Sequence, residues 1–209
     1  RTNAGLDNVN IYSKMMTHDV GDRTVVIVTS GNLGTSQAVY KSIEKDLNSS
    51  SGIMNLNTCN DFEQIASYIG SLNIEHSSPQ GINTDNVLLG STFIVGGQIK
   101  GQQHELYLVY PQGNYIRPAD SKPYLVIGEV KYGKPILDRV IKPEVSIGDA
   151  SRCAMISMDS TLKSDLTVGP PIDFAVHKKN ADKLVTLECL NVTDDTYSKV
   201  CNEWSEGIF

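Results

Sequence analysis

The chain has 209 residues, of which 40% are hydrophobic and 20% charged, a composition that is ordinary for a soluble protein. A chain of this length should bury roughly 70% of the surface that its unfolded form exposes, so it needs no disulfide or metal to fold. The net charge of −6 and the dispersed basic residues argue against a nucleic-acid partner, and no apolar run approaches the ~20 residues that span a membrane. We expect a single domain over residues 1–209.

The cysteines and histidines show neither a disulfide framework nor metal-ligand spacing. The cysteines are scattered without a CxxC pair (Cys59, Cys153, Cys189 and Cys201), and the four histidines are equally dispersed. This favours reduced thiols in a cytoplasmic protein without a metal. The motifs GxSxG, HExxH and GxGxxG are missing, and Gly133-Lys134 is followed by Pro135, which supplies neither the hydroxyl nor the backbone donor of a phosphate loop. We expect no cofactor.

In chain order, the pattern begins with two strands and two helices separated by polar loops. The predicted elements are strands over 9–16 and 23–30 with a turn at 19–22, helices over 33–47 and 60–72, and loops at 48–52 and 74–85. Asn60 is the expected N-cap of the second helix, with Glu63 at its third position.

The remaining chain reads as strands, two helices, two strands and a last helix. The predicted elements are strands over 91–98 and 105–110, short strands around Tyr115 and over 124–127, helices over 135–141 and 147–162, strands over 172–177 and 184–190, and a helix over 193–204. Because the helices are grouped between runs of strands, the order favours two stacked sheets with helices on both outer faces over a doubly wound parallel sheet.

Several segments together resemble the Anbu family, the ancestral β-subunit branch of bacterial proteasome-like proteins. The segments are RTNAG (1–5), Lys14-Met15, SGNL (30–33), GGQI (96–99), LVYPQG (108–113), IGEVKYGKPILDR (127–139), DST (159–161) and VGPPID (168–173). The resemblance covers essentially the whole chain, and the stretch from Glu129 to Arg139 is specific to that branch. It implies an α+β fold, a four-layer αββα sandwich, and a hydrolase whose nucleophile is the mature N-terminal threonine.

The resemblance also implies roles for individual residues near the strand-turn-helix segment 23–47. Lys14 matches a buried lysine beside the nucleophile, and Gly31 matches the glycine whose backbone N–H forms the oxyanion hole. Asp165 falls near an aspartate that steadies the nucleophile's amine. Glu129 stands where proteasome β-subunits generally carry a serine, and a carboxylate there would raise the pKa of an amine base.

The substrate positions implied by the resemblance lie on both sides of the lysine. Asn3 and Gly5 match backbone positions that pair with an extended peptide substrate. By their spacing from the expected lysine and glycine, Tyr12, Met16 and Thr29 would line the first specificity pocket. Core packing explains these three side chains about equally well.

The matched region begins just after the threonine and the lysine-orienting aspartate of the family. We therefore expect the first hairpin and the nucleophile upstream of Arg1, and the chain as printed to be inactive. Thr2 is no substitute, because it is not terminal and falls in a segment that should follow two strands.

The function expected is that of a cytoplasmic threonine peptidase or amidase subunit, acting on a peptide or unfolded protein. The resemblance implies assembly with copies of itself as a ring or open spiral. Two alternatives stay open: a non-catalytic scaffold subunit of the same fold, and an N-terminal-nucleophile amidase of another type. The residue at the native N-terminus distinguishes the three.

Overall fold

In the computed structural model, five antiparallel strands form the larger of two sheets, in the order β1-β2-β3-β4-β5. The strands are β1 (Met15–Val20), β2 (Arg23–Gly31), β3 (Ser91–Ile99), β4 (Glu105–Val109) and β5 (Tyr115–Ile116). The structure describes residues 12–49, 52–77 and 89–207. These divide into two compact units, one of Met15–Pro118 with His177–Leu184 and one of Arg1–Lys14, Ala119–Val176 and Val185–Phe209.

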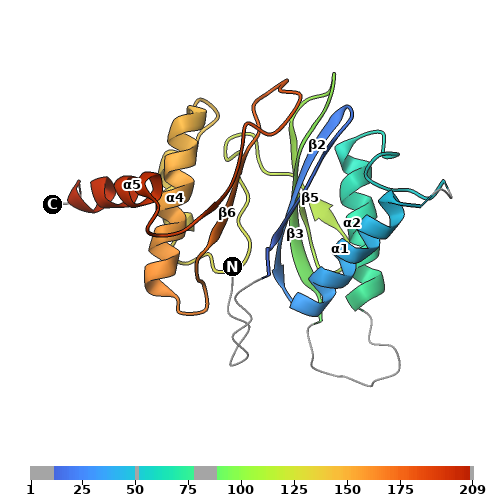
Figure 1. The fold of residues 1–209 in the computed structure, drawn as a ribbon, viewed down its shortest axis with the longest axis horizontal. Helices are drawn as coiled ribbons and strands as arrows, with labels where there is room; N and C mark the ends of the chain where they lie inside the picture. Colours follow the sequence, from blue (N-terminus) through green and yellow to red (C-terminus); the bar gives the residue numbers. More distant parts are fainter. Residues whose placement is uncertain (1–11, 50–51, 78–88, 208–209) are drawn as a thin grey trace. The chain divides into compact units, whose positions relative to one another are not determined.

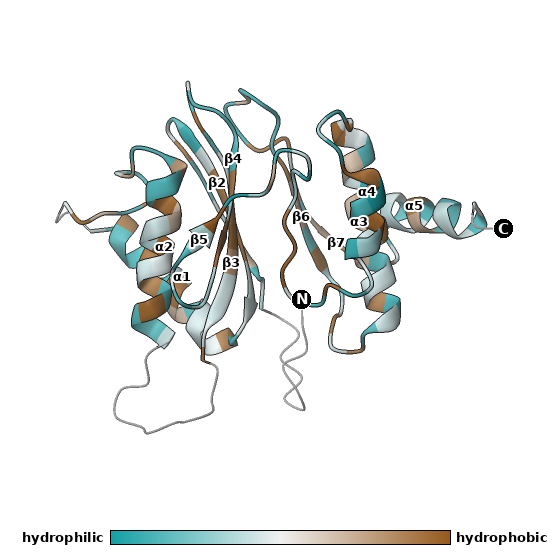
Figure 2. Ribbon diagram, turned by 180° about the vertical axis from the view of Figure 1, so that it is seen from behind, coloured by the Kyte–Doolittle hydropathy of each residue, from teal (hydrophilic) through white to brown (hydrophobic). Residues whose placement is uncertain are grey.

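Two helices, α1 (Leu33–Leu47) and α2 (Phe62–Ser77), cover one face of the five-stranded sheet (Figure 1). Successive side chains of a strand point to opposite faces, so every second residue of β2 and β3 faces the helices. Val25, Ile27, Phe93 and Val95 are fully buried there. The hydropathy colouring shows the same apolar strands at the centre of the unit (Figure 2).

The caps of these helices explain where each begins. The helix predicted over 33–47 is confirmed, and the side-chain oxygen of Asn32 caps it by accepting a bond from the backbone N–H of Thr35. The N-cap expected at Asn60 is wrong. Asp61 is the N-cap one residue later: its Oδ1 accepts from the Gln64 N–H at 2.8 Å, and Gln64 Oε1 accepts from the N–H of the preceding Asn60 at 2.9 Å.

The second helix also runs five residues beyond the predicted end at 72, to Ser77. Its added turn is polar in sequence, but those side chains are engaged. Asn73 is fully buried and donates to the carbonyl oxygens of Ser91 and Tyr110, and His76 Nε2 lies 2.8 Å from the Ser42 hydroxyl. The loop predicted from residue 74 is therefore wrong over 74–77.

Two of the strand predictions also need correction. The first strand does not end at 16 with a four-residue turn; it extends to Val20, and Gly21 (φ 68°) and Asp22 make a two-residue turn. Glycine with positive φ in the first central position suits such a turn. Residues 124–127 form no strand, and the Tyr124 N–H donates to the nearby Lys122 carbonyl oxygen at 2.9 Å rather than to a neighbouring strand.

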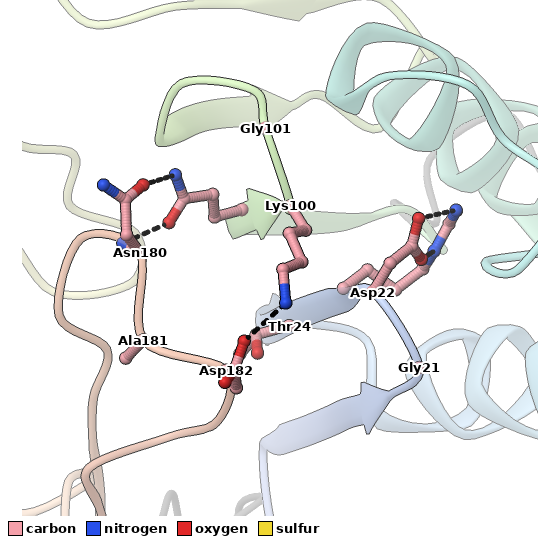
Figure 3. Close-up of a pocket in the computed structure, with 10 residues that line it drawn as sticks. Gly21, Asp22, Thr24, Lys100, Gly101, Asn180, Ala181 and Asp182 are labelled. Carbon is pink, nitrogen blue, oxygen red and sulfur yellow. Dashed lines mark hydrogen bonds and ion pairs between the residues drawn. The ribbon is translucent and has the colours of Figure 1, made fainter.

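The segment 177–184 belongs to the unit of the larger sheet and lies beside the ends of β2 and β3 (Figure 3). Gln98 and Asn180 hold it with a reciprocal pair of bonds: Asn180 N–H donates to Gln98 Oε1 at 2.8 Å, and Gln98 Nε2 donates to Asn180 Oδ1 at 3.0 Å. The Leu184 N–H donates to Asp19, so the strand expected from 184 begins only at Thr186.

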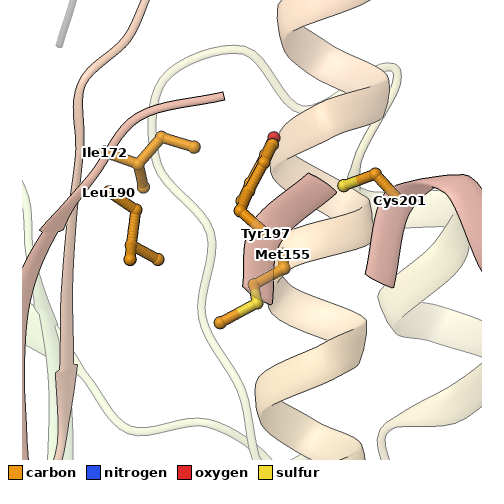
Figure 4. Packing of buried hydrophobic residues seen from close by; sticks show 5 residues of the cluster. All are labelled: Met155, Ile172, Leu190, Tyr197 and Cys201. Carbon is orange, nitrogen blue, oxygen red and sulfur yellow. The ribbon is translucent and has the colours of Figure 1, made fainter. Parts of the chain in front are cut away.

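The second unit packs helices onto a two-stranded antiparallel sheet. Its elements are α3 (Lys134–Val140), α4 (Ile147–Ser164), β6 (Ile172–Val176), β7 (Thr186–Leu190) and α5 (Asp195–Glu206). Its buried cluster joins α4, both strands and α5 through Met155, Ile172, Leu190, Tyr197 and Cys201 (Figure 4).

The α+β class, with two antiparallel sheets and helices packed on each, is confirmed. All four cysteines lie within the described residues, and no disulfide joins them. Among the described helices, none combines the length and apolar character needed to cross a bilayer.

Gly97 of β3 packs closely against the backbone of β2, and this contact predicts how two glycine substitutions should affect stability. A Cβ on Gly97 (φ 147°) would overlap the carbonyl oxygen of Thr24 on β2, whereas Gly101 (φ 85°) has open space around it. Gly101→Ala should cost about 1–2 kcal/mol for the positive φ alone. Gly97→Ala adds a backbone clash and should cost at least about 3 kcal/mol, or ~6–12 °C in Tm for a chain of this size. Equal melting temperatures for the two variants would contradict the described β2–β3 contact.

Candidate active site

Lys14 stands immediately before β1, and its side chain is half-buried rather than in bulk solvent. Burial lowers the pKa of its ammonium below the usual value. Removing water from an amine disfavours its charged form, so Lys14 is a better proton acceptor than an exposed lysine. A half-buried lysine of this kind is what the expected catalytic role requires.

Gly31 ends β2 and is exposed, directly before the N-cap of α1. Its φ of 111° lies in the region that only glycine adopts readily. A Cβ there would come within 2.9 Å of the Gly90 carbonyl oxygen and 3.1 Å of Ser91 Cα. Both the backbone conformation and the close packing therefore require glycine at this position.

The register of the strands shows where the Gly31 N–H points. The Lys100 N–H donates to the Asp22 carbonyl, and the Asn32 N–H contacts the Gly90 carbonyl at 3.5 Å, so even-numbered residues of β2 face β3. N–H groups alternate in direction along a strand. The Gly31 N–H therefore points to the β1 side.

Lys14 directly precedes β1 and Gly31 is the last residue of β2, so both stand at the same end of the β1–β2 ladder. β1 begins at Met15, which pairs with Val28, and Gly31 lies three residues beyond that partner. The Gly31 N–H thus projects past the first residue of β1 and is not used in the β2–β3 ladder. Lys14 is the residue that enters β1 at this end.

The expected substrate positions are placed as follows. Asn3 and Gly5 lie outside the described residues. Tyr12 precedes β1 and is partly buried, as is Met16, which pairs with Ile27. Thr29 is buried, and its hydroxyl lies 2.9 Å from the Ser36 hydroxyl of α1. Thr29 is thus on the helix-covered face of β2.

Asp165 and Glu129 both lie on the surface of the other unit, with Lys131 close to each. The Asp165 carboxylate accepts bonds from the Thr167 N–H and hydroxyl, and these bonds, with the charge of Lys131, lower its pKa. The Glu129 carboxylate accepts from the Lys131 N–H at 2.7 Å. Each carboxylate therefore orders its own turn.

One contact in this unit was missed by the sequence analysis. The Ser13 hydroxyl donates to Asp173 Oδ2 at 2.8 Å, although the two residues are 160 positions apart. Asp173 follows Ile172, which faces the helices, so its carboxylate projects from the opposite face of β6. It tethers the residue just before Lys14. No sequence spacing could have indicated this pairing.

A polar hollow of about 400 Å³ lies at the opposite end of β2 from Gly31 (Figure 3). Arg23, Lys100, Asp22 and Asp182 contribute its charges, and they are already paired: Arg23 with Asp22 at 2.8 Å and Lys100 with Asp182 at 3.1 Å. The hollow has no excess charge to attract an ionic ligand. No group of three metal-binding side chains occurs anywhere in the part of the chain that the structure describes.

Solved structures of known proteins match this chain over its full length. The Gly-1 mutant of Anbu from Hyphomicrobium sp. strain MC1 is 36% identical, with a TM-score of 0.89, and the match covers 100% of this chain and 87% of that chain. Anbu (ancestral β-subunit) from Yersinia bercovieri is 33% identical, with a TM-score of 0.90 and the same coverage. The Anbu complex of Pseudomonas aeruginosa, a helical assembly, is 33% identical with a TM-score of 0.89, covering 100% and 86%. No protein-family model and no curated protein sequence matches.

A contact between two histidines, His104 before β4 and His177, predicts a pH dependence of segment 177–184. His104 Nε2 lies 2.7 Å from His177 Nδ1, and burial, then His177 and Lys179, lower the pKa of His104. The stabilisation that comes from neutral His104 is present above its unfolded pKa near 6.5 and is lost as the pH falls through its lowered folded pKa. Amide exchange of 177–184, corrected for its intrinsic pH dependence, should lose protection between pH 7 and 5.

The matched variant His104→Gln keeps a donor for His177 but does not titrate. It should make the protection of 177–184 nearly independent of pH over the same range. An equal loss of protection in both proteins would exclude this histidine as the cause.

Proposed function

This chain belongs to the Anbu family of bacterial proteasome-like proteins, the ancestral β-subunit branch, and on that premise we propose that it is a threonine peptidase or amidase subunit. The family relates it to the N-terminal-nucleophile hydrolases. The proposed substrate is a peptide or an unfolded protein, and the proposed nucleophile is a mature N-terminal threonine upstream of Arg1. Residues 1–209 would form the rest of a single hydrolase domain.

In the proposed reaction, the threonine Oγ attacks the carbonyl carbon of the scissile bond and its proton passes to the free α-amine. The carbonyl oxygen becomes the oxyanion, which the Gly31 N–H would stabilise. The leaving amine departs with that proton as the tetrahedral intermediate collapses, leaving an ester. Water then attacks the ester carbonyl carbon and gives a proton to the α-amine. The amine returns that proton to the threonine Oγ as it leaves, which releases the acid and restores the enzyme.

The observation that carries the proposal is the end of the β1–β2 ladder. A half-buried lysine with a lowered pKa enters β1 there, and an exposed glycine N–H points past the start of that strand. A fixed backbone donor and an amine with a lowered pKa are two of the groups that acyl-transfer chemistry requires. Asn3, Gly5, Tyr12 and Met16 keep their proposed substrate roles. Thr29 is buried against Ser36 of α1, so core packing accounts for its side chain.

Two carboxylates complete the proposal, and both lie apart from the lysine in sequence. Asp165 would steady the α-amine, although its present partners are the N–H and hydroxyl of Thr167. Glu129 would raise the pKa of that amine, which weakens it as a base at neutral pH. The Glu129 side chain is partly exposed, so solvent would reduce this effect.

The two alternatives are a non-catalytic scaffold subunit and an amidase with another N-terminal nucleophile. Mass spectrometry of the native N-terminus separates them. Threonine there supports the peptidase, serine or cysteine supports the amidase, and any other residue supports the scaffold. The mature protein should also be labelled stoichiometrically by a peptide epoxyketone, which needs both the hydroxyl and the free amine. Residues 1–209 alone should stay unlabelled; stoichiometric labelling of them would contradict the proposal.

Lys14 provides the mutational test in the mature protein. Lys14→Ala should lower kcat by about 100-fold or more, because the lysine would favour the alkoxide as the threonine Oγ gives its proton to the α-amine. Lys14→Arg keeps a positive charge at every pH at which the protein is folded, so any alkaline loss of activity that comes from Lys14 should disappear. Lys100→Ala, at the opposite end of the sheet, is the matched control and should leave kcat unchanged. Full activity of Lys14→Ala would remove lysine from the mechanism.

We further propose that the subunit works in the cytoplasm and assembles with copies of itself. The helical assembly of the Pseudomonas aeruginosa complex supports self-assembly, and the three buried cysteines, which form no disulfide, fit a reducing compartment. Light scattering of the native protein should give a mass of several subunits that rises with concentration. A mass of one subunit at every concentration would contradict assembly.

A further inference from the structure

Four hydroxyl side chains gather in the interior directly behind Gly31. Thr29, Thr35, Ser36 and Ser91 come from β2, α1 and β3, and each is at most 5% exposed. We call these four residues the hydroxyl cluster. Apolar side chains would fill such a volume without the cost of burying polar groups, so the hydroxyls need an explanation beyond packing.

Ser36 is the hub of the hydroxyl cluster. Its Oγ lies 2.9 Å from the Thr29 hydroxyl, 2.9 Å from the Ser91 hydroxyl and 2.9 Å from the Asn32 carbonyl oxygen. Each hydroxyl has one proton to donate. Ser91 donates to the Asn32 carbonyl at 2.8 Å, Ser36 donates to the same carbonyl or to Ser91, and Thr29 can donate to Ser36.

The Asn32 carbonyl connects this cluster to the glycine. It receives the Ser36 N–H at 3.1 Å as the first helical bond of α1, besides the two serine hydroxyls. Gly31 is the preceding residue and is packed against the Gly90–Ser91 backbone. The Thr35 hydroxyl also donates to the Leu89 carbonyl, so the start of α1 is fixed to the segment that leads into β3.

A second helix holds the other side of this segment. Asn73 of α2 is fully buried, and its Nδ2 donates to the Ser91 carbonyl at 2.7 Å and to the Tyr110 carbonyl at 3.1 Å. Ser91, against which Gly31 packs, is therefore bonded to both helices: its hydroxyl contacts Ser36 of α1, and its carbonyl oxygen accepts from Asn73 of α2. Satisfied buried polar networks restrict a site to one geometry.

We propose that Ser36 is a positioning residue that fixes the Gly31 N–H for oxyanion stabilisation, acting through Ser91 and the Asn32 carbonyl. The inference rests on the proposed hydrolase function and deepens it. Ser36 is 2% exposed and acts through other groups, so it contributes no chemistry of its own. Its effect falls on the transition state, because only there does the substrate oxygen carry the charge that the N–H stabilises.

The test compares Ser36→Ala with the wild type in the mature, assembled protein. A displaced oxyanion donor should lower kcat by about 10- to 100-fold, while KM stays within about twofold. A peptide boronate, whose tetrahedral adduct places an oxygen at the oxyanion position, should lose affinity by a similar factor. The same peptide ending in an unreactive primary amide should bind equally well to both proteins.

The matched control is Ser42→Ala, on the same helix α1, where the hydroxyl contacts His76 and not the cluster. It removes one partly buried hydrogen bond of the same kind and should leave kcat and boronate affinity unchanged. Ser91→Ala should reproduce the Ser36→Ala signature. The losses in the double variant should be less than multiplicative, because both residues act on one carbonyl.

Ser36→Ala with wild-type kcat and boronate affinity would overturn the proposal, whatever its melting temperature. A wild type that neither hydrolyses peptides nor binds the boronate would instead overturn the proposed function. In that case amide exchange of the segment 30–36 decides the positioning role. Faster exchange there in Ser36→Ala than in Ser42→Ala supports it, and equal exchange rejects it.

Discussion

The paired ladder of β2 and β3 is the constraint on which the larger unit depends. Each strand has nine residues, and the register runs without interruption from Arg23–Ile99 to Gly31–Ser91. Its helix-facing side forms the core with α1 and α2, and its close backbone approach admits only glycine at position 97. Because a single register runs through both strands, it determines which residues lie opposite each other at both ends: Gly31 and Ser91 at one end, and Arg23 and Ile99 beside the polar hollow at the other.

The two ends of this ladder differ in how their polar groups are satisfied. At the hollow, the charged groups pair with each other, and the Gln98–Asn180 bonds hold segment 177–184 in place (Figure 3). At the Gly31 end, the hydroxyl cluster satisfies itself inside the core, while the Gly31 N–H points out past β1. Electrostatic preorganisation requires a donor, here the Gly31 N–H, that is held in position by fixed contacts behind it, here those of the hydroxyl cluster. The hydrolase proposal draws on this second end.

The second unit carries three partly buried carboxylates that have different partners. Asp165 and Glu129 each accept a hydrogen bond from a backbone N–H of their own turn. Asp173 instead accepts a hydrogen bond from Ser13, the residue before Lys14, 160 positions away in the sequence. The chemistry proposed for the chain therefore depends on Lys14, Gly31 and the residues that hold them more than on Asp165 and Glu129, whose bonds stay within their own turns.

The sequence by itself determined the features that depend on neighbours within a few residues. The helix Leu33–Leu47 and the apolar strands around 23–30 and 91–98 follow from local periodicity, and the glycine at 31 follows from a strand-to-helix turn. Only the tertiary structure decided which distant polar groups meet. Asn73, in the part of α2 that was not predicted, donates to the Ser91 carbonyl oxygen of β3, and the Tyr124 hydroxyl donates to Asp138. The hydroxyls of Thr29 and Ser91 both lie within hydrogen-bond distance of Ser36. Such pairings satisfy polar groups across the chain, and no local pattern encodes them.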